Sequence, residues 1–236
     1  MGELANRFIA CCRTIAGAEC IDDLPLSAVK KKQEPSKADF FFQSRTIICE
    51  IKSLEADPTE KFFRYLDSEG VKFSPETEYP DLIGYIEARP NGEAIWQKAM
   101  SLATTSIQDG ISSANKQIRA TKEVFGVASA DGLLVVLNGV SALLGPQLVI
   151  SRIRDRLMKP NAEGTGPYHD QIRQVILFSE NYMLDTPGEQ TAAAIPIANG
   201  AVAERHGVFA FLPTLVEVWA RCNDRTFAVR DISMHL

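Results

Sequence analysis

The sequence predicts an α/β protein in which a mixed central β-sheet is flanked by helices on both faces. Three observations favour this class. Two short runs rich in Phe and Ile, residues 38–42 and 46–53, indicate strands. A continuous apolar run at residues 131–138 indicates a buried strand. Amphipathic helical patterns alternate with these runs, which is typical of helices that cover a sheet.

The first half of the chain contains a helix, a hairpin and a second long helix. Apolar residues spaced by threes and fours predict the first helix over residues 4–17. The short gap between the two Phe- and Ile-rich runs favours a hairpin. The Pro- and Gly-containing stretch 55–92 predicts an insertion, with a short helix at 58–66 and a short helix or strand in "PDLIGYIEA". Periodic apolar residues predict the long helix over 93–125, with Gly110 marking a bend.

The second half continues the alternation of strands and helices. After the strand at 131–138, a helix is predicted over 146–159, with Pro146 in its first turn. Strands are predicted at 174–178 and at 191–199, the latter at a sheet edge because it contains Pro196. A helix over 212–222 and a last strand over 226–232 follow. We expect one domain, residues 1–236, with a core at about 1–140, the insertion 55–92 and a C-terminal extension 141–236.

Composition narrows the class of protein. The chain has 236 residues, of which 45% are hydrophobic and 23% charged, as in ordinary globular proteins. No apolar run reaches the roughly 20 residues that span a bilayer, and the N-terminus has no basic region, so we expect no membrane partner and no signal peptide. Five cysteines without a CxxC pair favour a cytoplasmic protein. The net charge of −5 argues mildly against non-specific nucleic-acid binding, although a bound cation would reverse the charge locally.

The predicted hairpin has one wholly apolar face. Folding the chain about Ser44 and Arg45 pairs Phe42 with Ile47 and Phe40 with Cys49. "SR" is not a favoured two-residue turn, so a longer loop stays open. Because side chains alternate between faces, one face carries only apolar groups, namely Phe40, Phe42, Ile47, Cys49 and Ile51.

The opposite face of the hairpin collects three charged groups. Asp39 faces Glu50, and Lys52 lies on the same face two residues further on. Opposed carboxylates repel at a Cβ separation of about 5 Å, and burial adds several kcal/mol for each uncompensated ion. Lys52 could pair with one carboxylate, one carboxylate could keep its proton, or a divalent cation could bind both. Carboxylate oxygens suit Mg²⁺ or Mn²⁺, while a purely structural ion network is the alternative.

Asp39 followed by Glu50-Ile51-Lys52 resembles the signature of the PD-(D/E)xK superfamily, the restriction-endonuclease-like phosphodiesterases. The predicted order of helix, hairpin, helix and strand over about residues 1–140 resembles the αβββαβ core of that family. Ala38 stands where the signature has Pro.

The resemblance implies a role for each matching residue. Asp39 and Glu50 would bind Mg²⁺ or Mn²⁺, and Lys52 would position or deprotonate the attacking water or stabilise the developing negative charge. Gln117, in "ANKQIRATK", resembles a site residue on the helix that follows the motif. Glu3, on the first helix, would be a further metal ligand.

Two functions follow as expectations. The first is a Mg²⁺-dependent endonuclease or exonuclease, with DNA favoured over RNA as the nucleic-acid substrate. The second is a catalytically inactive restriction-endonuclease-like fold that binds a protein or a nucleic acid. The sequence leaves a homodimer open.

Two further segments carry polar side chains. Arg152, Arg154, Arg156 and Lys159 form a basic helix face that either contacts phosphates or is simply solvated. Tyr168-His169-Asp170 is interpreted as part of a loop rather than as a catalytic group.

Overall fold

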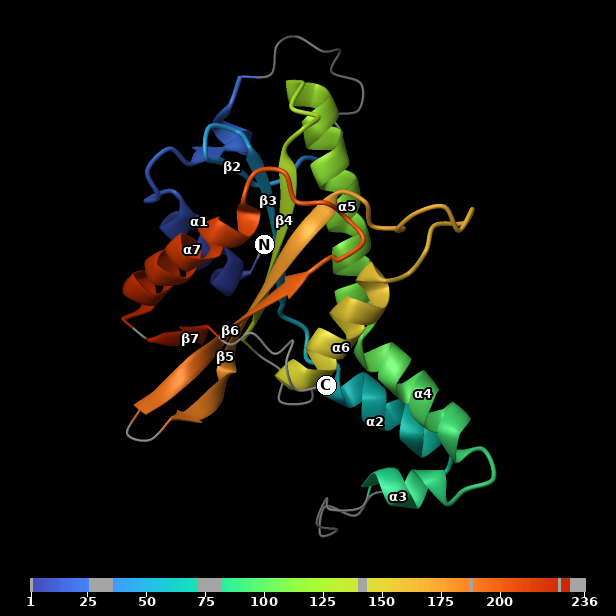
Figure 1. Ribbon diagram of the computed structural model, residues 1–236. Helices are drawn as coiled ribbons and strands as arrows, with labels where there is room; N and C mark the ends of the chain where they lie inside the picture. The colour runs from blue at the N-terminus through green and yellow to red at the C-terminus, as the bar shows by residue number, and fades with distance from the viewer. Residues whose placement is uncertain are drawn as a thin grey trace.

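The computed structural model describes residues 2–25, 36–71, 82–139, 144–186, 189–224 and 226–229. Within these ranges the strands form one seven-stranded sheet in the order β1 to β7. Helices lie on both sides of this sheet (Figure 1), so the predicted α/β class with a mixed sheet is confirmed.

The helices are α1 (Glu3–Cys12), α2 (Thr59–Ser68), α3 (Leu82–Glu87), α4 (Gly92–Ala103), α5 (Thr105–Phe125), α6 (Pro146–Leu157) and α7 (Val208–Asn223), with a short 3-10 helix η1 (Ile21–Asp23). The strands are β1 (Glu19–Cys20), β2 (Phe40–Phe42), β3 (Ile47–Leu54), β4 (Asp131–Asn138), β5 (Ile172–Thr186), β6 (Glu189–Ala198) and β7 (Phe227–Val229).

The pairing of the strands explains their composition. β1, β2 and β3 are antiparallel, whereas β4 is parallel to β3 and to β5. β6 is antiparallel to β5, and β7 is parallel to β6. The parallel centre of the sheet is covered on both faces, which is why β4 is a continuous apolar run instead of an alternating one.

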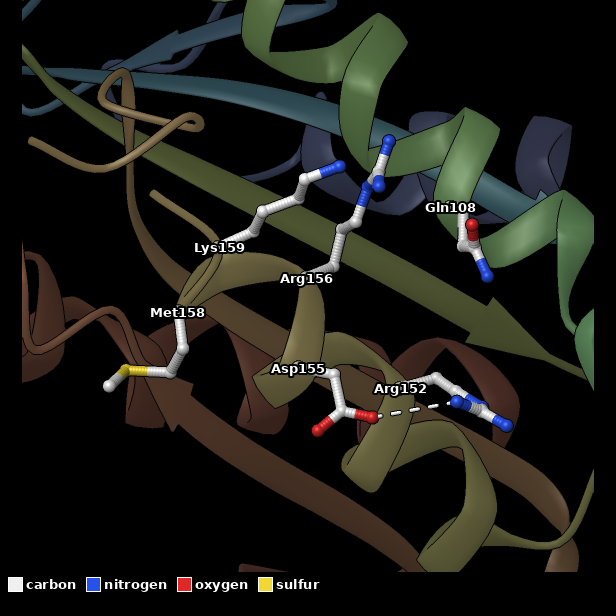
Figure 2. A pocket seen from close by; sticks show the side chains of 6 residues that line it. All are labelled: Gln108, Arg152, Asp155, Arg156, Met158 and Lys159. Carbon is white, nitrogen blue, oxygen red and sulfur yellow. Dashed lines mark ion pairs between the residues drawn. The ribbon is translucent and has the colours of Figure 1, made fainter. Parts of the chain in front are cut away.

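Each face of the sheet has its own hydrophobic core. One core lies under α1 and α7 and contains the apolar hairpin residues Phe40, Phe42 and Cys49. The other lies under α5 and α6 and contains Phe41 and Ile48. Beside this second core, a cavity of about 380 Å³ opens between α5 and the C-terminal half of α6 (Figure 2).

The hairpin has the predicted register but a longer turn. Phe40 pairs with Cys49 and Phe42 with Ile47. The turn spans residues 43–46, and Gln43, Ser44 and Arg45 all have positive φ angles of 48°, 55° and 66°. This conformation costs energy for residues with a Cβ. Arg45 offsets part of the cost, because it forms a 2.6 Å ion pair with Glu19 and lies over the ring of Phe41.

The predicted long helix is divided in two, and the division does not fall at Gly110, where a bend was predicted. The break is at Thr104, whose hydroxyl donates to the Met100 carbonyl at 2.8 Å. Gly110 lies inside α5, where an added Cβ would be 3.6 Å from Cγ of Lys52. The glycine therefore lies against the stem of Lys52 with room for a Cβ, inside the continuous helix α5.

The insertion folds into helices with a small core of their own. α2 corresponds to the predicted helix at 58–66, and "PDLIGYIEA" contains the helix α3; residues 72–81 lie outside the described ranges. These helices pack with α4 and project away from the sheet (Figure 1). The buried residues of this core are Phe62, Leu66, Val71, Ile86, Ile95, Ala99, Met100 and Ala103.

The C-terminal strands extend the sheet beyond the prediction. β5 is longer than the predicted strand at 174–178. β6 is not the outermost strand, because β7 pairs with Ala192, Ala193 and Ala194. Pro196 lies outside that short ladder, so its missing N–H removes no hydrogen bond to β7. The part of the predicted last strand beyond residue 229 lies outside the described ranges.

Two glycines test this packing. Gly110→Ala should raise the free energy of unfolding by up to about 1 kcal/mol, because Ala favours helix and its Cβ makes an ordinary contact with Lys52. In Gly132→Ala the new Cβ would lie 2.0 Å from the Gln171 carbonyl oxygen, so we expect a loss of more than about 2 kcal/mol. Urea denaturation followed by circular dichroism measures both, and equal midpoints for the two variants would contradict the packing.

Candidate active site

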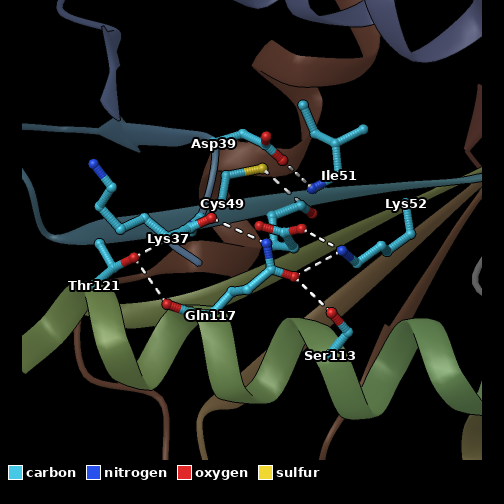
Figure 3. A network of polar contacts seen from close by, with 10 residues as sticks. Lys37, Asp39, Cys49, Ile51, Lys52, Ser113, Gln117 and Thr121 are labelled. Carbon is cyan, nitrogen blue, oxygen red and sulfur yellow. Dashed lines mark hydrogen bonds and ion pairs between the residues drawn. The ribbon is translucent and has the colours of Figure 1, made fainter. Parts of the chain in front are cut away.

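Asp39 is anchored beside β3 by a backbone group. It directly precedes β2, and its Oδ2 accepts a 2.7 Å hydrogen bond from the backbone N–H of Ile51 (Figure 3). The Asp39 N–H in turn donates to the Cys49 carbonyl at 3.0 Å. The side chain thus continues the hairpin's hydrogen bonding past the end of β2, and the carboxylate is held close to Glu50.

Glu50 is the most deeply buried charged group of the site. It lies in the middle of β3 and is only 2% exposed. Its Oε1 forms a 2.6 Å ion pair with Lys52 Nζ. Its Oε2 is buried and has no hydrogen-bond partner within the described residues. A buried carboxylate oxygen without a hydrogen bond lowers the stability of the folded protein, and a proton or a cation bound at this atom would offset that loss.

Gln117 fixes the position of the Lys52 ammonium group. Lys52 Nζ donates to Gln117 Oε1 at 2.7 Å, and Ser113 Oγ donates to the same oxygen at 2.8 Å. The Gln117 amide nitrogen donates to the Lys37 carbonyl at 3.0 Å (Figure 3). With both ends of its amide bonded, Gln117 is held beside Lys52.

Two site residues were missed in the sequence, Ser113 and Thr121. The Thr121 hydroxyl accepts from Ala38 N–H at 2.9 Å and donates to the Gln117 carbonyl at 2.8 Å, which holds the segment before Asp39 against α5. Both residues lie four positions from Gln117, so the spacing of one helix face could have identified them.

Glu3 does not join the site. It is an exposed residue in the first turn of α1, and α1 packs on the face of the sheet opposite to α5. The start of α1 lies near Glu55 and Gly139, which follow the C-terminal ends of β3 and β4. Accordingly, no group of three or more His, Cys, Asp or Glu residues gathers within the described ranges.

Burial raises the pKa values of both carboxyl groups. The pKa of Asp39 rises to about 6, mainly because the group is desolvated, while the bond from Ile51 and the charge of Lys52 oppose the rise. The pKa of Glu50 rises to about 8 because of burial and then the negative charge of Asp39, again opposed by Lys52. The contact between Lys52 and Glu50 stabilises the ionised form of Glu50, whereas burial and Asp39 favour its protonated form.

The acid pair suits Mg²⁺ or Mn²⁺ bound by two carboxylates, with the other ligands coming from outside the protein. Mg²⁺ is commonly held by one or two carboxylates, with water and substrate phosphate completing its shell. Asp39 and Glu50 would supply the two carboxylates, and Oε2 of Glu50, to which no described residue donates a hydrogen bond, is an available ligand atom. These two residues supply too few ligands for a metal site built mainly from protein groups.

The remaining candidates lie away from the carboxylates. His169 is fully buried in the segment before β5, and burial lowers its pKa to about 4. Its ring packs edge-to-face against Tyr168, so it acts as a packing residue in the predicted loop. Cys11 and Cys12 are buried in α1 as part of the core.

No helix in the described part of the chain combines the length and apolarity that crossing a bilayer requires. Comparisons with protein-family models, with curated proteins and with solved structures find no significant match to this chain.

The raised pKa values predict that the metal-free protein loses stability as pH rises. The folded-state pKa values of about 6 and about 8 lie above the ordinary values of 3.8 and 4.5, so the folded protein binds more protons than the unfolded chain in this window. The stability that these two groups contribute is fully present below their ordinary pKa values, and it is lost as pH rises through their raised pKa values in the folded protein.

Thermal melting in EDTA between about pH 5 and about pH 9 measures the effect. We expect Glu50→Gln, which stays neutral, to flatten the decline, whereas Glu55→Gln, at an exposed carboxylate, should follow the wild type. An unchanged decline in Glu50→Gln would show that Glu50 is not the group responsible.

Proposed function

We propose that this chain is a metal-dependent phosphodiesterase that hydrolyses nucleic acid, with DNA the favoured substrate. The observation that carries the proposal is the Oε2 of buried Glu50, which has no hydrogen-bond partner in the described part of the chain and lies close to Asp39 and within the reach of Lys52 and Gln117. The order of elements supports it, since α1, the three strands β1 to β3, α5 and β4 follow one another as αβββαβ, apart from the helical insertion.

Each side chain has a task that its contacts suit. When bound by Asp39 and Glu50, Mg²⁺ or Mn²⁺ would polarise a phosphoryl oxygen and lower the pKa of a water molecule. Ile51 N–H orients Asp39 through the 2.7 Å bond to Oδ2. Lys52 would position the attacking water or stabilise negative charge that develops on the phosphate. Gln117 orients the Lys52 ammonium by accepting its hydrogen bond.

The alternative is a catalytically inactive binding module on the same fold. The 2.6 Å ion pair between Lys52 and Glu50 favours it, because the pair neutralises one carboxylate without a cation. In that case the charged cluster would serve the structure, and any nucleic acid or protein would bind elsewhere.

We expect Mg²⁺- or Mn²⁺-dependent cleavage of DNA that is lost in Asp39→Asn, Glu50→Gln and Lys52→Ala. Each change removes a carboxylate ligand or a group that stabilises the transition state, and we expect rates to fall about 100-fold or more. Gln117→Ala should cost less, because Lys52 remains. Release of a fluorescent label from DNA measures the rates, with Lys116→Ala, an exposed neighbour on α5, as the matched control.

Wild-type activity in Lys52→Ala would remove the proposed chemistry. Cleavage that persists in EDTA would remove the requirement for a metal.

Metal binding separates the enzyme from the inactive module. Isothermal titration with Mn²⁺ should show one site in the wild type, and Glu50→Gln should abolish the heat because the site loses a carboxylate ligand. Glu55→Gln removes an exposed carboxylate at the end of β3 and should bind normally. Identical titrations for wild type and Glu50→Gln would favour the inactive module.

A further inference from the structure

The cavity between α5 and α6 is basic, although the chain as a whole has a net charge of −5. We call it the basic cavity (Figure 2), and it is lined by Gln108, Arg152, Asp155, Arg156, Met158 and Lys159. Three of these side chains are cations and one is an anion. The other arginine of the predicted basic face, Arg154, is not part of the lining.

The single carboxylate leaves most of this positive charge uncompensated. Asp155 pairs with Arg152 at 3.6 Å, and the side chain of Asp155 is 64% exposed. It therefore lies in solvent, where an ion pair is weak. The charges of Arg156 and Lys159 have no carboxylate ion-pair partner within the described residues.

Arg156 has hydrogen-bond donors to spare. Its Nη2 contacts the Ser112 hydroxyl at 3.3 Å, and its Nε is buried with no partner within the described ranges. A guanidinium carries five N–H donors in a planar fork that suits the oxygens of a phosphate. The guanidinium therefore has donors that no acceptor among the described residues uses.

A partly exposed aromatic ring lies next to the basic cavity, and the two cations lie over it. Tyr168 is 45% exposed, and both Arg156 Cζ and Lys159 Nζ are 5.8 Å from the centre of its ring. Cations that contact a backbone, together with an aromatic surface for bases, are the combination by which proteins bind single-stranded nucleic acid. A free phosphate would use the cations alone.

The basic cavity and the candidate active site lie on neighbouring faces of α5. Ser112 contacts Arg156 at the cavity, and the next residue, Ser113, contacts Gln117 in the active site. A strand that reaches one face of this helix is therefore close to the other.

We propose that the basic cavity binds the phosphodiester backbone of an unpaired nucleic-acid strand, with a base stacked on Tyr168. The inference rests on the proposed function and specifies its substrate, because bases paired within a duplex cannot stack on this ring. Arg156, Lys159 and Arg152 contact phosphate oxygens, and Tyr168 provides the preference for an unpaired strand.

Binding without cleavage tests the proposal. In EDTA, fluorescence anisotropy follows a labelled single-stranded DNA of about 16 nucleotides, at the upper end of single-strand site sizes. We expect Arg156→Gln with Lys159→Gln to weaken binding at least about tenfold and to reduce the slope of log K against log salt concentration by about 0.7 for each phosphate that is no longer neutralised. Lys61→Gln with Lys98→Gln removes the same charge from exposed positions on α2 and α4 and should bind as the wild type.

Two single variants keep the test informative if the double variant misfolds. Lys159→Gln changes an exposed side chain and should by itself reduce that slope by the share of one phosphate. Tyr168→Leu should weaken single-stranded binding about tenfold and leave duplex binding nearly unchanged. Thermal melting confirms that each variant is folded.

The outcomes distinguish this inference from the proposed function. Equal weakening by both double variants would overturn the cavity as a site, since bulk charge would explain it. Wild-type binding of a duplex as tight as that of a single strand would overturn the unpaired substrate, and displacement by equimolar inorganic phosphate would indicate a free anion instead of a polynucleotide. Binding that depends on Arg156 and Lys159 without any cleavage by the wild type would refute the nuclease and leave the cavity assignment standing.

Discussion

The burial of Glu50 in the central part of the sheet is the constraint on which the rest of the site depends. A carboxylate at 2% exposure must be paired, protonated or bound to a cation, because its desolvation is expensive. Lys52 satisfies one oxygen and leaves the other without a partner within the described residues. Asp39 adds a second acid nearby, so the cluster is costly as a structural device and reasonable as a binding site for a cation.

Helix α5 connects this cluster to the rest of the molecule. Ser113, Gln117 and Thr121 recur at four-residue intervals on one face of the helix. Gln117 binds Lys52, Ser113 binds Gln117, and Thr121 binds the segment before Asp39. Gln108 lines the basic cavity, and Ser112 accepts a hydrogen bond from Arg156, which lines it from α6. One helix therefore positions the groups proposed for chemistry and borders the surface proposed for substrate, so both depend on how it packs against β3.

Local patterns predicted the hairpin well and the longer elements less well. Its register followed from side-chain alternation, because a shift of one residue would have put Phe40 and Phe42 on the charged face. The break at Thr104 was not predicted, since helical periodicity continues across it from α4 into α5. The sequence pointed to Gly110 instead of Thr104, because a glycine within a helical pattern is the usual signal for a bend.

The sequence by itself determined the fold class, the hairpin and the gathering of Asp39, Glu50 and Lys52 on one face, because these depend on alternation within a few residues. Only the tertiary structure decided that Gln117 reaches Lys52 across 65 positions, that Glu3 lies apart, and that Arg156 meets Ser112 across the basic cavity. Such contacts join segments far apart in the chain. They depend on how whole helices pack over the sheet, and no local pattern of residues encodes that packing.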